Sequence, residues 1–156
     1  MDMVAAQSTS SDVPQISGTS NVHVTAQPGS FGALVIIHAI LLGVPFVFLF
    51  PIGIVGLRWL RSFKLHWMLQ AFATCACYIG LVVAIVLSVT GFQYSDFNQA
   101  HQIIGIVVTA CLGAQIAFGY FHHRNFKRVG RRTVISYFHL WTGRGLIYLG
   151  MVDTVL

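Results

Sequence analysis

Four histidines stand out because each lies near the beginning of a different long apolar stretch. They are His38, His66, His101 and His139. A neutral imidazole offers one ring nitrogen with a lone pair and is the commonest metal ligand among side chains. An ionisable side chain surrounded by apolar sequence is costly to retain and by default marks a functional site. The residue type and its placement therefore predict that these histidines bind a metal centre.

The composition indicates that these histidines belong to a membrane protein. Of 156 residues, 56% are hydrophobic and 8% are charged, and the mean hydropathy is +0.75. A soluble domain carries about 25% charged residues, so the polar residues here are too few to cover a water-facing surface, which excludes a soluble enzyme. The net charge of +5 is spread too thinly over apolar sequence for nucleic-acid binding.

Four apolar stretches are long enough to cross a bilayer, whose hydrocarbon core needs about 20 residues of helix. The connections between them are short, which makes successive helices antiparallel neighbours. We therefore expect an all-α membrane protein, a four-helix transmembrane bundle over residues 31–156 that follows a disordered, Ser- and Thr-rich tail of residues 1–30. Its helices should span about residues 31–57, 65–90, 100–121 and 136–156.

The charges predict an orientation, because all nine basic residues fall on one side of this arrangement and the four acidic residues fall on or near the other. Cytoplasmic loops are rich in Lys and Arg, so the basic side should be cytoplasmic and the N-terminus extracellular or lumenal. The basic loops should also attract anionic lipid headgroups. The basic residues are Arg58, Arg61 and Lys64, then Arg124, Lys127, Arg128, Arg131 and Arg132, then Arg144; the acidic residues are Asp2, Asp12, Asp96 and Asp153.

Antiparallel helices begin alternately on opposite faces, so the four histidines should fall at two depths. His38 and His101 should lie toward the N-terminal face, on the first and third helices, which are diagonal partners in a four-helix bundle. His66 and His139 should lie toward the basic face, on the second and fourth helices. The sequence thus predicts two facing imidazole pairs, about 20 Å apart along the membrane normal.

Each pair suits a haem better than a bare metal ion. Two histidines alone make a poor structural zinc site, which normally has four ligands, whereas a porphyrin leaves the iron only two axial positions to fill. Two axial imidazoles leave no position for a substrate and dispose the iron to electron transfer. Since no Cys-x-x-Cys-His segment is present, a covalent c-type haem is excluded, and we assign Cys75, Cys77 and Cys111 to packing.

Helical periodicity adds small residues to the inward face of each helix. Positions 18 apart share a helical face, and a small residue there should leave room for the macrocycle that the other pair holds. Eighteen residues after His38 and His101 stand Gly56 and Gly119; the same face reaches Gly80 and Ala84 from His66 and Gly150 from His139. Gln70 and Gln115 share the inward faces and are candidates for hydrogen bonds there.

Four further side chains have weaker or open interpretations. His122 and His123 lie beside the basic loop, where an interfacial position is favoured over metal ligation, and His23 lies in the tail. Arg144 has three interpretations that stay open: a partner for a haem propionate, a binding group for an anionic donor, or a side chain that reaches the membrane surface.

The four histidine segments together resemble the cytochrome b561 family over residues 30–156, most closely the modules that follow extracellular DOMON domains. The resemblance implies two non-covalent b haems that carry electrons from a cytoplasmic, ascorbate-like donor to monodehydroascorbate or ferric iron across the membrane. It also implies the ligand pairs His38 with His101 and His66 with His139. The segments are H-A-I-L-L-G-V-P-F-V-F-L-F-P-I-G from His38, K-L-H-W-M-L-Q from Lys64, A-H-Q-I-I-G-I from Ala100 and H-L-W-T-G-R-G from His139.

The sequence departs from the family pattern at both ends. Thirty residues before the first helix cannot form a DOMON domain, so we expect an acceptor module to be a separate protein or a second copy of the chain to complete the assembly. Family members continue into at least one more helix after the fourth histidine, so we expect this sequence to be C-terminally truncated. A transmembrane ferric reductase is the leading hypothesis; a haem-bearing anchor that passes electrons to a partner protein and a haem-free membrane scaffold stay open.

Overall fold

The computed structural model describes residues 28–90 and 97–156, which form helices joined by short connections, with no strand among them. The predicted tail lies outside the described residues except for its last three, which already belong to the first helix. Asp96, between the second and third predicted helices, also lies outside them.

The first predicted helix is a continuous helical rod built from three elements. α1 (Pro28–Val44) leads into a short π-helix, η1 (Pro45–Leu49), and then into α2 (Phe50–Trp59). Pro45 and Pro51 have no N–H to donate to the carbonyls four residues earlier, so the regular ladder is interrupted near both ends of η1. The N–H of Phe50 bonds instead to the oxygen of Pro45, five residues back. Two prolines therefore account for the wider turn.

The remaining helices are α3 (Phe63–Thr90), α4 (Ala100–Val129) and α5 (Val134–Asp153). α4 extends eight residues beyond the predicted end at residue 121, so three basic residues expected in a loop lie on its last turns. Cationic side chains are stabilised near a helix C-terminus, and Gly130, with φ of 70°, ends the helix in the left-handed conformation. The end of the apolar stretch therefore does not mark the end of the helix. The three residues are Arg124, Lys127 and Arg128.

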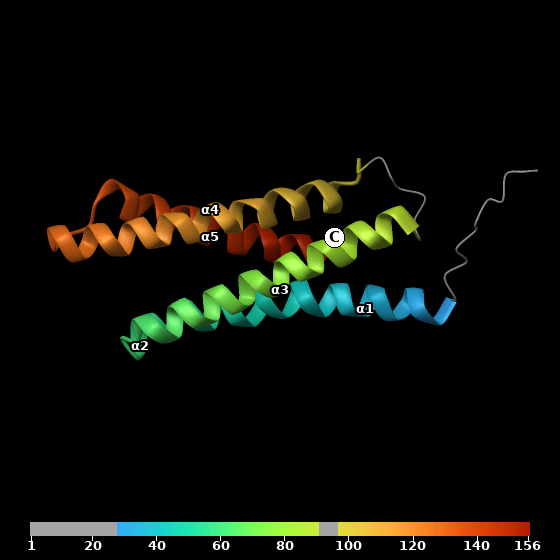
Figure 1. Ribbon diagram of the computed structural model, residues 1–156, viewed down its shortest axis with the longest axis horizontal. Helices are drawn as coiled ribbons and strands as arrows, with labels where there is room; N and C mark the ends of the chain where they lie inside the picture. The colour runs from blue at the N-terminus through green and yellow to red at the C-terminus, as the bar shows by residue number, and fades with distance from the viewer. Residues whose placement is uncertain (1–27, 91–96) are drawn as a thin grey trace, which may run out of the picture.

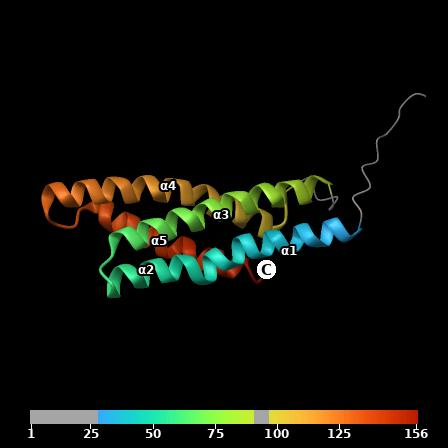
Figure 2. The ribbon, with the colours of Figure 1, turned by 60° about the horizontal axis from the view of Figure 1, so that its bottom comes forward.

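The helices pack as two antiparallel hairpins (Figures 1 and 2). In the first hairpin the rod α1–η1–α2 packs along α3, and in the second hairpin α4 packs along α5. The hairpins meet where α3 contacts α4 and where η1 contacts α5. The π-helix thus lies where the two hairpins join.

A small buried core lies at this junction. Its aromatic centre is Phe46 and Phe50, 3% and 2% exposed, with ring centroids 5.2 Å apart. In lipid, which is as apolar as these side chains, helix association depends on close van der Waals packing and not on burial from water. The other buried members are Ala73, Cys77, Val108 and Leu112.

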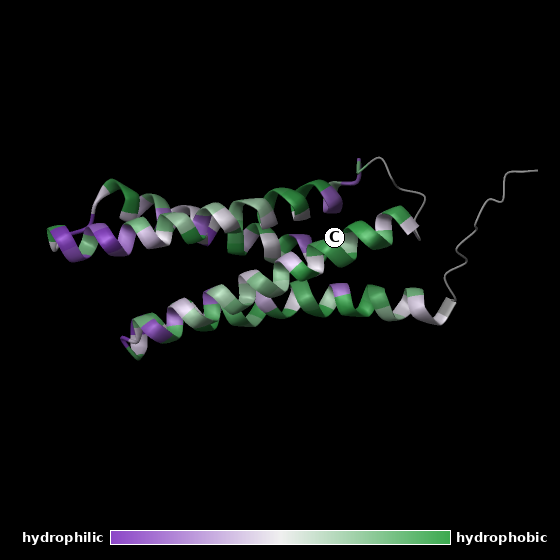
Figure 3. Ribbon diagram, viewed as in Figure 1, coloured by the Kyte–Doolittle hydropathy of each residue, from purple (hydrophilic) through white to green (hydrophobic). Residues whose placement is uncertain are grey.

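Three helical segments of the described chain are long and apolar enough to cross a membrane: Gly29–Trp59, Phe63–Thr90 and Ala100–Val129. α5 is not among them. Large apolar side chains are exposed along these segments, for example Ile36 at 60% and Phe72 at 66%. Figure 3 shows apolar residues along the rods and hydrophilic residues gathered at the end of the molecule where α4 ends. These features are consistent with an integral membrane protein.

Candidate functional site

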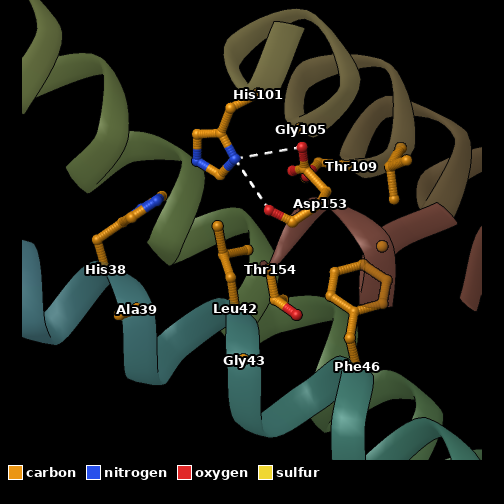
Figure 4. Close-up of a pocket in the computed structure, with 12 residues that line it drawn as sticks. His38, Ala39, Leu42, Gly43, Phe46, His101, Gly105, Thr109, Asp153 and Thr154 are labelled. Atoms are coloured by element: carbon orange, nitrogen blue, oxygen red, sulfur yellow. Dashed lines mark hydrogen bonds and ion pairs between the residues drawn. The ribbon is translucent and has the colours of Figure 1, made fainter. Parts of the chain in front are cut away.

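The structure brings His38 of α1 and His101 of α4 together at the end of the molecule where α1 and α4 begin. Their ring centroids lie 6.1 Å apart and the ring planes are at 89°. Figure 4 shows the two side chains projecting from different hairpins toward the same space. Two imidazoles on opposite sides of one metal, with bonds of about 2 Å and about 1 Å more to each ring centre, would have centroids about 6 Å apart. The pair predicted from helix alternation therefore has the spacing of a shared metal centre.

Hydrogen bonds to backbone carbonyls indicate the tautomer that both rings have when they are neutral. His38 Nδ1 lies 3.1 Å from the Gly80 carbonyl oxygen, and His101 Nδ1 lies 3.1 Å from the Asp153 carbonyl oxygen. A carbonyl only accepts, so Nδ1–H donates in both cases and, in the neutral ring, Nε2 keeps its lone pair. Metal-binding histidines commonly donate their other N–H in this way.

Gly80 allows α1 to approach α3 closely enough for the first of these bonds. A Cβ at this position would lie 3.1 Å from both the Leu41 Cβ and the Leu42 Cγ. That spacing is tighter than ordinary side-chain contacts, so a larger residue would push the helices apart. The missing side chain therefore exposes the carbonyl that His38 reaches.

Asp153, the last residue of α5, adds a carboxylate to the pair. Its Oδ1 lies 3.2 Å from His101 Nδ1, and its side chain is only 9% exposed, against 44% for that of His101. It is the one acidic residue in the described part of the chain. His101 thus faces both the backbone oxygen and the side chain of the same residue, as the dashed lines in Figure 4 mark.

Two cavities adjoin the His38–His101 pair. Their volumes are about 230 and 140 Å³, and both are bordered by the two histidines. The larger one extends toward Phe46 and Gly150, and the smaller one toward Ala84 and Leu87. The linings shared by both cavities are His38, Leu42, His101, Gly105, Thr109 and Asp153. The pair therefore borders mainly apolar space that reaches into both hairpins.

His66 of α3 has the same kind of support as His38. Its Nδ1–H donates to the Gly53 carbonyl oxygen of α2 at 3.1 Å. One turn later, Gln70 Nε2 donates to the Phe50 oxygen at 3.1 Å, which confirms the predicted inward orientation of this amide. The ring of His66 lies near that of Phe63, with centroids 6.5 Å apart.

His139 of α5 differs from the other three histidines. Its Nδ1 is buried and has no hydrogen-bond partner among the described residues. Gly119 of α4 lies against the ring, and a Cβ there would be 3.1 Å from His139 Cε1. The ring contact of His139 is with His122, at 5.8 Å and 16°. His66 and His139 therefore have different ring neighbours, and the structure shows no ring contact between them.

The hydrogen bonds also give the separation of the two histidine levels. Gly80 follows His66 by 14 residues on α3, and Asp153 follows His139 by the same 14 residues on α5. At 1.5 Å per residue, each spacing corresponds to about 21 Å along its helix. Hydrogen bonds bring His38 beside Gly80 and His101 beside Asp153. In both hairpins the two histidine depths are therefore about 21 Å apart along the helix, against about 20 Å predicted along the membrane normal.

The four glycines predicted to make room for a macrocycle each lie against a side chain of a neighbouring helix, which is close helix packing. Gly150 also borders the larger cavity beside the His38–His101 pair. The largest contacting group is the ring of Phe46, which belongs to the other hairpin and lies against Gly150. The contacts are Gly56 with Leu65, Gly80 with Leu42, Gly119 with His139 and Gly150 with Phe46.

The side chains with open interpretations lie away from the His38–His101 pair. The Arg144 guanidinium is 5.3 Å from the ring centre of the exposed Trp141, on the same helix. His122 Nδ1 is 2.7 Å from Ser136 Oγ, which ties α4 to the first turn of α5. His123 stacks on Phe63 at 3.9 Å and 7°.

Asp153 is a functional candidate that composition and spacing did not reveal. Its charge alone placed it only among the acidic residues near the N-terminal face. Fourteen residues at 100° each bring a position back to within about 40° of the starting face, so Asp153 and His139 share one side of α5. Helical phase combined with the scarcity of acidic residues would have identified it.

Comparison with known proteins gives a family but no function. A family model described as a domain of unknown function, DUF2427, matches residues 19–124, about two thirds of the chain. The match includes His38, His66 and His101 and stops before His139. No curated protein and no solved structure matches the chain. With its family model covering most of its length, the chain belongs to the DUF2427 family.

Proposed function

We propose that this protein is a transmembrane electron carrier of the cytochrome b561 type. In this proposal α5 joins the three apolar segments in a four-helix transmembrane bundle that holds two b haems. His38 and His101 ligate one, and His66 and His139 the other. Electrons pass from an ascorbate-like donor in the cytoplasm to ferric iron or monodehydroascorbate on the opposite face. The observation that carries the proposal is the His38–His101 pair, with centroids 6.1 Å apart.

The chemistry of the donor set fits this cofactor. His38, His66 and His101 each donate Nδ1–H to a backbone carbonyl, which leaves Nε2 as the ligating atom. The buried Nδ1 of His139 has no such acceptor among the described residues, so no hydrogen bond sets the ligating nitrogen of this ring. The two cavities provide apolar space beside the first pair.

Haem supplies a reversible one-electron couple when it is bound. The chain's own residues hold it and control its surroundings. His38 with His101, and His66 with His139, would hold it through their imidazole nitrogens and would keep oxygen and substrates from the iron. Apolar side chains such as Leu42 and Val108 exclude water from the site. At the opposite end, exposed Lys and Arg side chains concentrate anionic donors near the basic face.

The orientation is part of the proposal. The exposed basic residues at the ends of α2 and α4, and those between the helices, should be cytoplasmic, with the N-terminus extracellular or lumenal. A Ser10→Cys variant tests this with an impermeant thiol reagent. In right-side-out vesicles the introduced thiol should react without opening of the membrane, in a background in which Cys75, Cys77 and Cys111 are replaced by Ala. Labelling only after permeabilisation would invert the topology.

The deciding experiment is a reduced-minus-oxidised visible spectrum of the purified full chain with a haem-to-chain ratio. The proposal expects b-type bands and a ratio of two. Vesicles loaded with ascorbate should then reduce an external ferric chelate, and empty vesicles should not. Absence of haem would refute the proposal. Two haems without ferric reduction would instead support an anchor that delivers electrons to a partner protein.

A further inference from the structure

We infer that Asp153 is a positioning residue for His101 and makes the two haem sites unequal, with the lower reduction potential at the His38–His101 site. This inference rests on the proposed function. It assigns to one carboxylate the difference between two sites that otherwise have the same ligands.

The geometry places two oxygen atoms of Asp153 against one ring nitrogen. His101 Nδ1 lies 3.1 Å from the backbone oxygen and 3.2 Å from Oδ1. The Asp153 side chain is nine-tenths buried, and Oδ1 makes no hydrogen bond of regular geometry in the described structure. The carboxylate therefore faces the ring of His101 and not solvent.

Neither candidate ligand of the second pair has a carboxylate beside it in the described structure. His66 donates to the neutral carbonyl of Gly53, and His139 has a buried, unpartnered Nδ1. Among the described residues, the carboxylate is therefore a feature of the His38–His101 site alone.

The position of Asp153 is unfavourable for a carboxylate that serves packing alone. It is the last residue of α5, where the negative end of the helix dipole disfavours an acidic side chain. It also borders both cavities, whose linings are mainly apolar, and a buried charge there is costly unless it is paired. The group that the structure places beside the carboxylate is the His101 ring, with Nδ1 3.2 Å from Oδ1.

The Asp153 carboxylate would act on the site through its charge. Its Oδ1 lies 3.2 Å from His101 Nδ1, whose N–H donates to the backbone oxygen of the same residue. A nearby negative charge in a medium of low dielectric constant favours the more positive, oxidised iron and so lowers the reduction potential. The His38–His101 site, on the face where the acceptor binds in the proposal, is then the stronger one-electron reductant of the two.

The test is a redox titration of the full chain in membranes, with each haem followed by its visible band. Asp153→Asn keeps the side-chain shape and the backbone oxygen but removes the charge. One of the two potentials should rise by at least 59 mV, a tenfold change in a one-electron equilibrium, while the other stays in place. Asp153→Glu, which keeps the charge, should remain close to wild type. Ser88→Ala is the control, because Ser88 lines the smaller cavity and bonds to Gln102, not to a histidine.

A second measurement does not need the Asn variant to fold. In wild type the two potentials should differ, and His101→Ala should remove the lower one. Loss of the higher reduction potential in His101→Ala would overturn the inference, and so would an Asp153→Asn variant in which both potentials stay in place or shift equally. In each case, two bound haems would leave the proposed function standing. A wild-type chain without haem would overturn both.

Discussion

The two helical hairpins place a histidine at the same level in the same way but give it different acceptors. In the first hairpin His38 donates to the carbonyl of Gly80, and in the second His101 donates to the carbonyl of Asp153. Both acceptors lie 14 residues after the histidine of the returning helix. The shared spacing sets the depth of the histidines, whereas the residue at the acceptor position sets the charge beside them.

The other histidine of each hairpin differs as well. His66 donates to the Gly53 carbonyl, but His139 has no partner for its buried Nδ1 among the described residues. In the first hairpin both histidine rings are held by hydrogen bonds to neutral backbone carbonyls. In the second hairpin one ring lies beside a carboxylate, and the Nδ1 of the other has no hydrogen-bond partner among the described residues. A buried polar group without a partner in the fold marks a place where a bound group would act. We therefore expect the residues of the second hairpin to modulate the proposed electron transfer.

The largest effect is expected from substitutions of the proposed haem ligands, because either ligand of a pair should be needed to hold the haem of that pair. His38→Ala and His101→Ala should each remove one haem, and the double variant should lose no more, because the two residues act as one unit. His66→Ala and His139→Ala should behave likewise at the other site. The measurement is the haem-to-chain ratio of each purified variant.

The cross-pair variant distinguishes the pairing from its alternatives. His38→Ala with His66→Ala should lose both haems, whereas His38→Ala with His101→Ala should keep one. Equal haem content in these two double variants, with helical content preserved by circular dichroism, would show that the pairing is wrong.

A substitution at the junction of the hairpins should have the next largest effect. A Cβ on Gly150 of α5 would collide with the ring of Phe46, which is buried in η1 and surrounded by the core. Gly150→Ala should therefore cost about 1–3 kcal/mol of unfolding free energy. Gly145→Ala on the same helix is the control, since no atom lies within 4 Å of its Cβ position. Equal stability of the two variants in mixed micelles would mean that α5 does not pack on η1.

Much of this architecture was predictable from the sequence, because lipid demands long apolar helices and charges mark their ends. Alternation along the chain placed His38 beside His101, and helical phase placed Gln70 inward. The extension of α4 to residue 129 was not predicted, since helical structure outlasts the apolar stretch when cations and Gly130 favour it. The filling of the glycine faces and the Asp153–His101 contact depend on how two distant hairpins pack, which no local pattern encodes.

The helix corners of the two hairpins should also differ in stability. At the first corner Ser62 Oγ accepts one bond, from the Leu65 N–H. At the second corner Ser136 Oγ contacts the Thr133 N–H and the His122 ring, so it joins the cap of α5 to α4. Ser136→Ala should cost about 1 kcal/mol, the typical value of a lost cap, and more than Ser62→Ala.

The same corner tests the assignment of His122. Its Nδ1 is engaged by Ser136, and it lies beside His139 without belonging to either ligand pair. His122→Gln should leave the haem ratio at the wild-type value and lower stability by about as much as Ser136→Ala. Loss of one haem in this variant would make His122 a ligand and remove His139 or His66 from that role.

The smallest expected effect is a difference in stability between variants of Gln70 and Gln115, the two glutamines on the inward faces. Gln70 donates one bond, to the Phe50 oxygen, whereas Gln115 donates to the His139 oxygen and accepts from Thr142 Oγ1. A hydrogen bond between membrane helices contributes about 0.6 kcal/mol on average. Gln115→Met should therefore destabilise the protein by about 0.6 kcal/mol more than Gln70→Met, a replacement of the same length in both cases. The larger loss should also affect the site of His139, because Gln115 holds the backbone of that residue. Parallel unfolding curves in mixed micelles measure the difference, and a larger cost for Gln70→Met would mean that the first hairpin relies more on its amide than the second does.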